Sequence, residues 1–381
     1  MQRLKYECID NFHPVYFVGF LGTGITTNIL YNFPYKAKWL QVLGLIMFAL
    51  TIFIFLSTNL MLLLSILYHP KRLTLYNHDS TYSIYFAVYS MGYTTIVNAI
   101  HLFAHGRFPI FLWVLWWIGV FIAIYNSSIM FFLSFLSKIN AHSLSNIHAS
   151  IFMPIVCPCV ISSTGHLIAP DLPNAQLKII TEILSLMLLF VSLILFHGVG
   201  ALYIARLVLC KIPNTQNLFT SYLPVGFTGQ SSYSIMLFGS NMVNFIPDES
   251  IGNAFGVSCG LISTFFLSGG YIYLFIAIAS TLAKIRPFAK SLNLEHTKYG
   301  LIKWNKGFWT LTFPIGTMSL ANFEISKGVI GGYELKFFKV MSAIFGVALI
   351  LVCVGNLIGL SYKIYKKFML KEFKNDKTEK V

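Results

Sequence analysis

The chain has 381 residues, of which 56% are apolar and only 10% are charged, and its net charge is +14. A soluble globular domain is about 25% charged, so this composition excludes an ordinary soluble enzyme, a disordered chain and a disulfide-rich secreted domain. The basic residues are confined to short segments between apolar stretches. That distribution indicates membrane topology and argues against nucleic acid as a partner.

Ten stretches of 17 residues or more contain no Asp, Glu, Lys or Arg. A membrane-spanning helix needs roughly 20 mostly apolar residues, and a charge at the bilayer centre costs about 3 kcal/mol even on insertion scales. We therefore predict an all-α integral membrane protein with ten transmembrane helices in the lipid bilayer. In chain order the stretches cover residues 11–35, 39–70, 80–106, 108–137, 139–170, 183–205, 212–247, 250–283, 307–323 and 340–362.

The basic residues between these stretches predict how the chain is oriented. If ten helices alternate in direction, 20 of the 27 Lys and Arg residues lie on the side of both chain ends. Cytoplasmic loops are enriched in Lys and Arg, so both termini are predicted to be cytoplasmic. The predicted organisation is an N-terminal segment 1–10, a ten-helix transmembrane domain 11–362 and a basic tail 363–381.

Few titratable side chains lie within or beside the stretches. Glu182 and Arg206 flank the sixth stretch and are expected to reach interfacial water. His101, His166 and His197 are candidates for a proton relay, although a membrane histidine is more often hydrogen bonded to a neighbouring helix. No stretch holds a Lys or Arg that could bind an anion tightly, which favours a conduit over a high-affinity site.

A similar pattern of small and polar residues recurs in the odd-numbered stretches. Ser90 stands where the pattern would place proline, so the third helix is expected to bend less than the others. The intervals between these segments each contain one apolar stretch, so the chain is predicted to form five helical hairpins in series. In chain order the segments are Phe20-Leu21-Gly22-Thr23-Gly24, Tyr89-Ser90-Met91-Gly92, Met153-Pro154-Ile155-Val156, Leu223-Pro224-Val225-Gly226 and Phe313-Pro314-Ile315-Gly316.

The recurring prolines suggest how the hairpins are arranged. Proline inside a helix removes a hydrogen bond and bends the axis, and freed backbone groups are tolerated at membrane depth only beside protein or water. We therefore predict an inner ring of odd-numbered helices around a central aqueous pore, with the even-numbered helices facing lipid. Small residues would allow close packing, and hydroxyls would donate hydrogen bonds to an anion. The predicted pore-lining residues are Gly22, Thr23, Gly24, Gly92, Thr95, Pro154, Pro224, Gly226, Pro314, Gly316 and Thr317. The alternative is that Pro, Gly and Ser are simply common in membrane helices.

Two regions of the sequence resemble a known family. The first stretch contains Asn11-Phe12-His13-Pro14 and Gly22-Thr23-Gly24-Ile25, and the ninth begins with Lys306-Gly307-Phe308-Trp309 and continues with Thr312-Phe313-Pro314-Ile315-Gly316-Thr317. These segments resemble the fungal plasma-membrane sulfite efflux pumps. The pumps belong to the tellurite-resistance/dicarboxylate transporter family, with the fungal malate permease and the plant slow anion channel. The resemblance covers nearly the whole chain and is weakest in the tail 363–381.

The resemblance implies a fold and a function. The fold would be ten helices, as five hairpins around a pore, and the function would be export of sulfite or bisulfite across the plasma membrane. In the family a phenylalanine of the ninth helix plugs the pore, and Phe313 matches that position. Its counterparts in the repeat are Phe20, Tyr89, Met153 and Leu223, which we add to the predicted pore lining. The alternative is that Phe313 only packs against neighbouring helices. Relatives also suggest a homotrimer.

Other functions stay open at this point. A malate-type dicarboxylate permease could share the fold, but a larger dianion should require a fixed cation in the pore, and the inner stretches have none. A polytopic sensory receptor needs no fivefold repeat, and an intramembrane enzyme needs a cluster of catalytic groups. We expect no enzyme activity, no cofactor and no metal; Cys157-Pro158-Cys159 lacks zinc-site spacing, and no ATP-binding G-x-x-x-x-G-K-[ST] motif occurs. Channel and proton-linked carrier mechanisms are both compatible with the sequence.

Overall fold

The structure is a computed structural model that describes residues 9–136, 143–285, 301–328 and 332–378. Helices and their connections make up these residues, and no β-strand occurs among them. The predicted all-helical class is therefore confirmed. The helices of 15 residues or more are α2 (Phe17–Tyr31), α3 (Lys38–Tyr68), α5 (Ser80–Ala104), α6 (Pro109–Ile124), α7 (Phe152–Ile168), α8 (Ala175–Cys210), α9 (Leu223–Phe245), α10 (Glu249–Leu282), α11 (Thr312–Ser326) and α12 (Lys336–Thr378). Shorter helices are η2 (Pro14–Tyr16), α4 (Arg72–His78), η3 (Tyr125–Met130), η4 (Phe132–Leu136), η5 (Leu144–Asn146), η6 (Ala149–Ile151), η7 (Ala169–Asp171), η8 (Thr215–Tyr222) and η9 (Lys306–Leu311).

Each predicted stretch overlaps one of the ten long helices, and several helices, such as α8 and α12, extend beyond their stretch. Within the described residues, six helices are long and apolar enough to cross a membrane by length and composition. The chain is thus a multi-pass membrane protein. The crossing of α2, α5, α9 and α11 stays a prediction, because these helices are shorter or richer in Gly, Ser, Thr and Asn. The six cover Lys38–Tyr68, Pro109–Leu136, Ala149–Asp171, Ala175–Cys210, Glu249–Leu282 and Lys336–Lys366.

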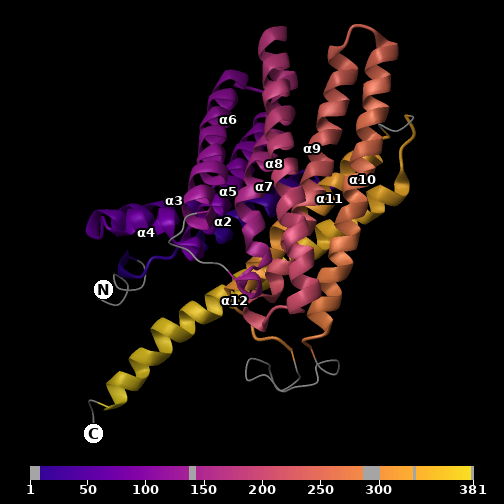
Figure 1. Ribbon diagram of the computed structural model, residues 1–381. Coiled ribbons are helices and arrows are strands. Elements are labelled where there is room, and N and C mark those ends of the chain that lie inside the picture. The colour runs from indigo at the N-terminus through magenta and orange to yellow at the C-terminus, as the bar shows by residue number, and fades with distance from the viewer. Residues whose placement is uncertain (1–8, 137–142, 286–300, 329–331, 379–381) are drawn as a thin grey trace.

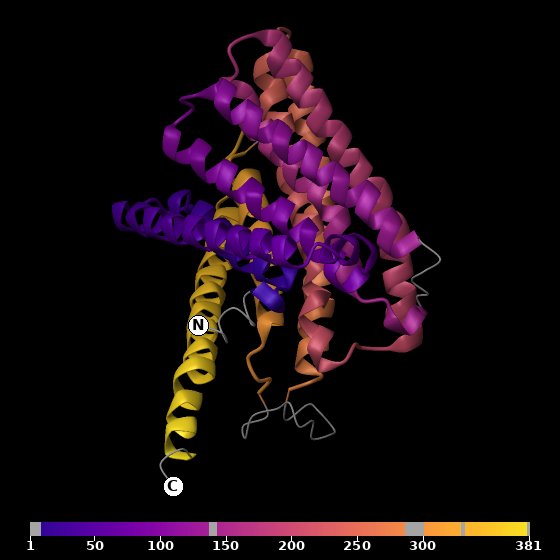
Figure 2. The same cartoon turned by 90° about the vertical axis from the view of Figure 1, so that its left-hand side faces the viewer.

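The helices that carry the repeat pack against one another in a closed series. Helix α2 contacts α5, α5 contacts α7, α7 contacts α9, α9 contacts α11, and α11 returns to α2. Each of them also packs against the long helix that follows it in the chain. Figure 1 shows one such pair, α9 and α10, rising side by side to a short connection. The C-terminal part of α12 leaves the bundle in both side views (Figures 1 and 2).

The two sets of helices differ in burial. In α2, every residue from Phe17 to Leu30 is buried, whereas α3 buries only Leu40 and a stripe of small side chains. That stripe has one member every seven residues, the spacing that keeps one face of a helix against a partner. Large apolar side chains cover the remaining surface of α3, among them Phe53 at 69% exposure. Such a surface suits lipid and would not stay exposed to water. The stripe consists of Gly44, Thr51, Thr58 and Ser65.

The prolines occupy helix starts, which corrects the prediction that they bend helix interiors. Pro224 and Pro314 lie in the first turns of α9 and α11, and Pro154 lies in the first turn of α7. A 3-10 helix directly precedes each of these helices. The first-turn amides of a helix have no intrahelical partner, so proline there costs no hydrogen bond. Among the prolines that the structure describes, Pro158 of α7 is the one inside an α-helix, and α5 runs unbroken through Ser90.

Candidate functional site

The predicted pore-lining residues all lie on the closed series of helices α2, α5, α7, α9 and α11. All of them are buried except Tyr89, which is half-buried. The structure therefore places them in the interior of the bundle. Whether they line a pore stays a prediction.

The glycines of the repeat are close-approach positions between neighbouring helices. A Cβ atom on Gly92 of α5 would lie 2.2 Å from the Phe20 ring of α2. A Cβ atom on Gly226 of α9 would lie 3.0 Å from the Phe313 ring of α11. Each glycine thus accepts an aromatic side chain of the adjacent helix. The packing role predicted for small residues is observed, and Phe313 sits directly against a glycine of the repeat.

The five bulky counterpart positions belong to one region of the core but have different immediate neighbours. Phe20 and Tyr89 pack edge to face with ring centroids 5.7 Å apart, and both contact Phe55 of α3. The Tyr89 hydroxyl also donates to Asn59 Oδ1 of α3 at 3.1 Å. These two aromatic side chains are therefore tied to α3, whereas Phe313 packs against α9. All except the half-buried Tyr89 are members of a single apolar core.

The threonines of the repeat use their hydroxyl hydrogens within their own helices. Thr23 Oγ1 donates to the carbonyl of Gly19 at 3.0 Å, Thr95 Oγ1 to Gly92 at 2.7 Å, and Thr317 Oγ1 to Pro314 at 2.9 Å. Only the acceptor lone pairs of these oxygens remain available to a neighbour. Donation to an anion therefore stays a prediction, and it would require these hydroxyls to rotate away from their own helices.

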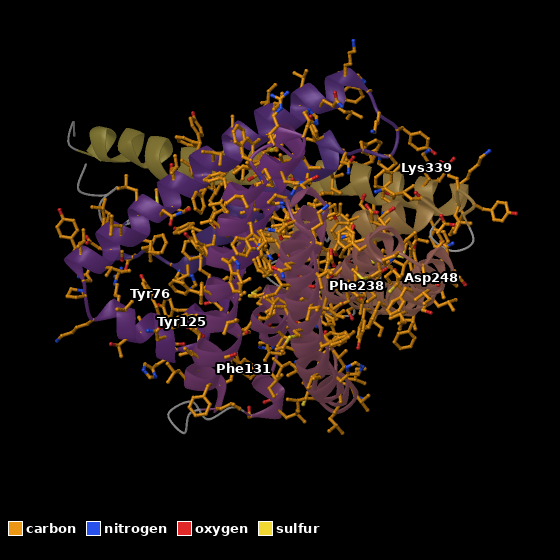
Figure 3. The ribbon with its side chains drawn as sticks, turned by 90° about the horizontal axis from the view of Figure 1, so that it is seen from above. Tyr76, Tyr125, Phe131, Phe238, Asp248 and Lys339 are labelled. Carbon is orange, nitrogen blue, oxygen red and sulfur yellow. The ribbon has the colours of Figure 1, made fainter. Side chains whose placement is uncertain are left out.

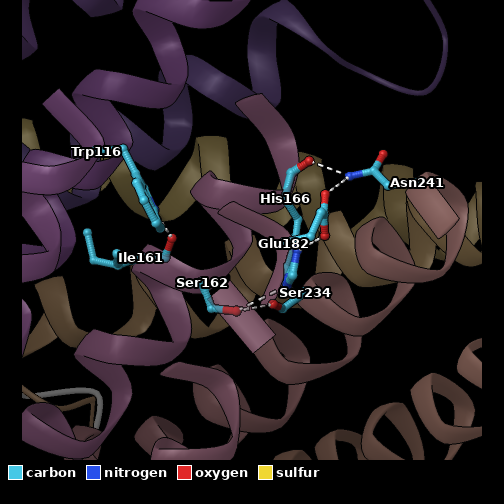
Figure 4. Close-up of polar contacts among 7 residues, drawn as sticks. All are labelled: Trp116, Ile161, Ser162, His166, Glu182, Ser234 and Asn241. Atoms are coloured by element: carbon cyan, nitrogen blue, oxygen red, sulfur yellow. Dashed lines mark hydrogen bonds and ion pairs between the residues drawn. The ribbon is translucent and has the colours of Figure 1, made fainter. Parts of the chain in front are cut away.

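A buried polar network joins α7, α8 and α9 (Figure 4). His166 Nδ1 lies 2.5 Å from Glu182 Oε2, and the two side chains are 0% and 1% exposed. Asn241 Nδ2 donates to Glu182 Oε1 and to the His166 carbonyl, both at 2.6 Å. Ser162 extends the network, since its hydroxyl lies 3.3 Å from His166 Nε2 and 2.8 Å from the Ser234 hydroxyl.

Apolar and aromatic groups enclose this network. The ring of Phe238, labelled in Figure 3, lies 5.4 Å from the His166 ring. The indole of Trp116 donates to the Ile161 carbonyl at 3.0 Å, on the same helix as His166 (Figure 4). The hydrogen-bonded pair of His166 and Glu182 is therefore shielded from solvent on several sides. The sequence identified His166 as a titratable residue, but it gave no indication that Glu182 is its partner.

Glu182 and Arg206 correct a second prediction, because neither reaches interfacial water. Glu182 is held by His166 and Asn241, and Arg206 is only 4% exposed. The reason is length: α8 runs from Ala175 to Cys210, well beyond the charge-free stretch, so both residues lie inside its packed part. Sequence spacing along one helix does not show which neighbouring segments cover it.

The other two histidines named from the sequence have different surroundings. His101 Nε2 lies 2.7 Å from Asp171 Oδ2, where the histidine side chain is 12% exposed and the aspartate 34%. His197 lies 2.6 Å from the Leu193 carbonyl of its own helix. Two of the three histidines thus pair with a carboxylate, and only the His166 pair is fully buried.

The sequence matches the family described as voltage-dependent anion channel, SLAC1, over residues 11–360. It is 45% identical over 364 residues to a Candida albicans protein named sulfite efflux pump SSU1, covering 95% of this chain and 76% of that protein. A Saccharomyces cerevisiae protein of the same name is 25% identical over 386 residues, covering 88% and 83% of the two chains. One from Arthroderma benhamiae is 27% identical over 379 residues, covering 96% and 93%.

Proposed function

The chain belongs to the SLAC1 family of voltage-dependent anion channels, and from this premise we propose that it exports sulfite or bisulfite across a membrane. The observation that carries the proposal is the 45% identity to a sulfite efflux pump over 95% of the chain. This membership confirms the resemblance seen in the first and ninth stretches. It also identifies the chain as a transporter or channel.

The closed series of inner helices supports a path along the axis of the bundle. Five buried helices form it, and five largely exposed apolar helices surround it. In this proposal the transporter domain 11–362 crosses the plasma membrane ten times, as five hairpins. Both termini lie in the cytoplasm, and the basic tail 363–381 follows the last span. Three copies of the chain would form the homotrimer.

The membrane potential supplies a driving force for export. A negative interior favours exit of an anion by about 2.3 kcal/mol per charge per 100 mV. The protein then only has to lower the barrier that a low-dielectric slab imposes on a bare anion. Carrying an anion down this gradient requires no nucleotide.

Flux through the purified protein in liposomes tests the proposal. Uptake of labelled sulfite should exceed uptake of malate, nitrate and chloride, with protein-free liposomes as the control. In cells, deletion of the gene should cause sulfite sensitivity and leave malate uptake intact. Malate flux without sulfite flux would instead assign the chain to the dicarboxylate permeases.

Phe313→Ala tests the proposed gate. If the ring blocks the path, its removal should raise sulfite flux about tenfold or more, because lowering a barrier by only about 1.4 kcal/mol changes a rate tenfold. Phe265→Ala is the matched control, since Phe265 is 70% exposed on α10 and should leave flux unchanged. Unchanged or lower flux through folded Phe313→Ala protein would restrict Phe313 to a packing role.

A further inference from the structure

A buried arginine without a counter-ion lies at the C-terminal end of α8. Arg206 is 4% exposed, and its Nη1 donates to the Lys211 backbone carbonyl at 2.5 Å. Its Nε atom is buried and has no hydrogen-bond partner. Within the described part of the chain, no carboxylate lies within ion-pair distance of this guanidinium. The positive charge is therefore only partly compensated.

Burial of such a charge is unfavourable. The effective desolvation penalty of a buried ion is several kcal/mol, and it is offset only when the charge is paired and its remaining donors are hydrogen bonded. The carbonyl of Lys211 and the negative end of the α8 dipole account for one side of the guanidinium. They leave Nε without an acceptor. An anion is the group that would complete the site.

Three further polar groups near Arg206 also lack partners. The Tyr203 hydroxyl lies near Ser221 and Arg206, and His148 lies close enough to interact with the Arg206 charge. The Tyr203 hydroxyl, the Ser221 hydroxyl and His148 Nδ1 are all buried and unbonded. The Tyr203 and Ser221 hydroxyls lie close enough to act on each other, but neither makes a hydrogen bond of normal geometry to a described residue. Buried polar atoms are rarely left unsatisfied, so several at one place indicate a missing ligand.

These groups come from three segments that meet at one end of the bundle. Tyr203 and Arg206 lie on α8, Ser221 lies on η8 before α9, and His148 directly precedes η6, which leads into α7. Segments η6 and η8 pack against each other. The cluster therefore lies where α7 and α9 begin, and both of these helices belong to the inner series.

We propose that Arg206, Tyr203, Ser221 and His148 bind a small oxyanion at the end of the bundle where α7 and α9 start. A guanidinium, two hydroxyls and an imidazole each supply an N–H or O–H donor to an anionic oxygen. The polar atoms are buried where η6 and η8 pack together, which favours a small free anion such as sulfite or sulfate over a lipid headgroup. The inference rests on the proposed function in one respect, because the bound anion is taken to be the transported anion before it enters the path.

Thermal unfolding of the purified full-length protein in detergent tests the site. Sodium sulfite and sodium sulfate should raise the midpoint temperature in a saturable manner, and sodium chloride at equal ionic strength should not. Arg206→Gln should abolish the effect, and the exposed Arg107→Gln should preserve it. Tyr203→Phe should weaken the apparent affinity about tenfold, the expected loss for one hydrogen bond to a charged group.

Tyr203→Phe decides the matter if Arg206→Gln fails to fold. Its hydroxyl makes no hydrogen bond of normal geometry to a described residue, so its removal should leave the stability of the protein in chloride buffer close to that of the wild type. If Tyr203→Phe and Arg206→Gln retain the wild-type response to sulfite and sulfate, the proposal is wrong and Arg206 only caps α8. Stabilisation by phosphatidate micelles alone, with no response to either free anion, would also overturn it.

Flux in liposomes separates this inference from the proposed function. If the wild type carries sulfite and Tyr203→Phe shows an unchanged half-saturating concentration and thermal response, the site is wrong and the export function stands. If the wild type carries no sulfite but the anion response depends on Tyr203 and Arg206, the site stands and sulfite is not the cargo.

Discussion

Helix α8 carries a buried acidic residue near one end and a buried basic residue near the other, and the two differ in how they are hydrogen bonded. Glu182 has His166 and Asn241 on its two carboxylate oxygens. Arg206 has one carbonyl acceptor, and the polar groups around it are unbonded. A satisfied buried network stabilises one packing of the helices. An unsatisfied one is unfavourable for stability and leaves donors that can bind a ligand.

Glu182 and Arg206 therefore differ in hydrogen bonding and not in burial. Both residues lie on α8 and are almost fully buried. Glu182 contacts α9, and Arg206 lies near η8, the segment that precedes α9. Burial therefore does not distinguish structural from ligand-binding groups here. The number of hydrogen-bond partners does distinguish them. It predicts that substitutions at the two ends of α8 change stability in opposite directions.

Glu182→Ala should have the largest effect. It leaves His166 and Asn241 without their shared partner, and removing one member of a buried ion pair costs about 3–5 kcal/mol. The thermal midpoint of the purified protein should fall strongly. Glu249→Ala, an exposed carboxylate in the first turn of α10, should leave the midpoint almost unchanged. Equal midpoints for both variants would show that the His166–Glu182 pair does not stabilise the bundle.

Asn241→Leu should have an intermediate effect. The new side chain is similar in size but leaves Glu182 Oε1 and the His166 carbonyl without their donor, at a cost of about 1–3 kcal/mol. Asn244→Leu is the matched control on the same helix, because Asn244 is exposed and bonds only its own helix at Ser240. Comparable unfolding curves for the two leucine variants would remove Asn241 from the network.

The smallest effects are expected for serine-to-alanine substitutions next to the two ends of α8. Ser162→Ala removes a bonded hydroxyl and should lower stability by about 1 kcal/mol. Ser221→Ala removes an unbonded one, and in the absence of anion it should raise stability by up to about 1 kcal/mol. Differential scanning fluorimetry in chloride buffer compares them directly. A loss at both positions would mean that the Ser221 hydroxyl has a partner and that the two ends are alike.

Much of the helix pattern could be predicted from sequence, because charge-free length is a local property. Each of the ten stretches overlaps a long helix, and the helices of the odd-numbered stretches form the buried series. The prolines were misplaced within their helices, since proline suits a first turn and a kink equally well in one dimension. Thr23 and its counterparts were assigned as donors, although a threonine in a helix readily bonds its own backbone.

The surroundings of Glu182 and Arg206 could not be predicted from the sequence, for a different reason. The partner of Glu182 is His166, 16 residues earlier across the turn between α7 and α8. The neighbours of Arg206 come from segments before α7 and before α9. Only the packing of three helices defines these surroundings. A charge beside a hydrophobic stretch is normally placed at the membrane surface, and here that rule fails at both ends.

The stripe of small side chains on α3, with one member every seven residues, has a consequence for how this sequence can change in evolution. Only one narrow face of that helix is held to a specific shape, so most of its positions tolerate exchange among Leu, Ile, Phe and Val. Divergence between relatives should therefore accumulate on the outer helices. Shared ancestry should be read from the inner ones.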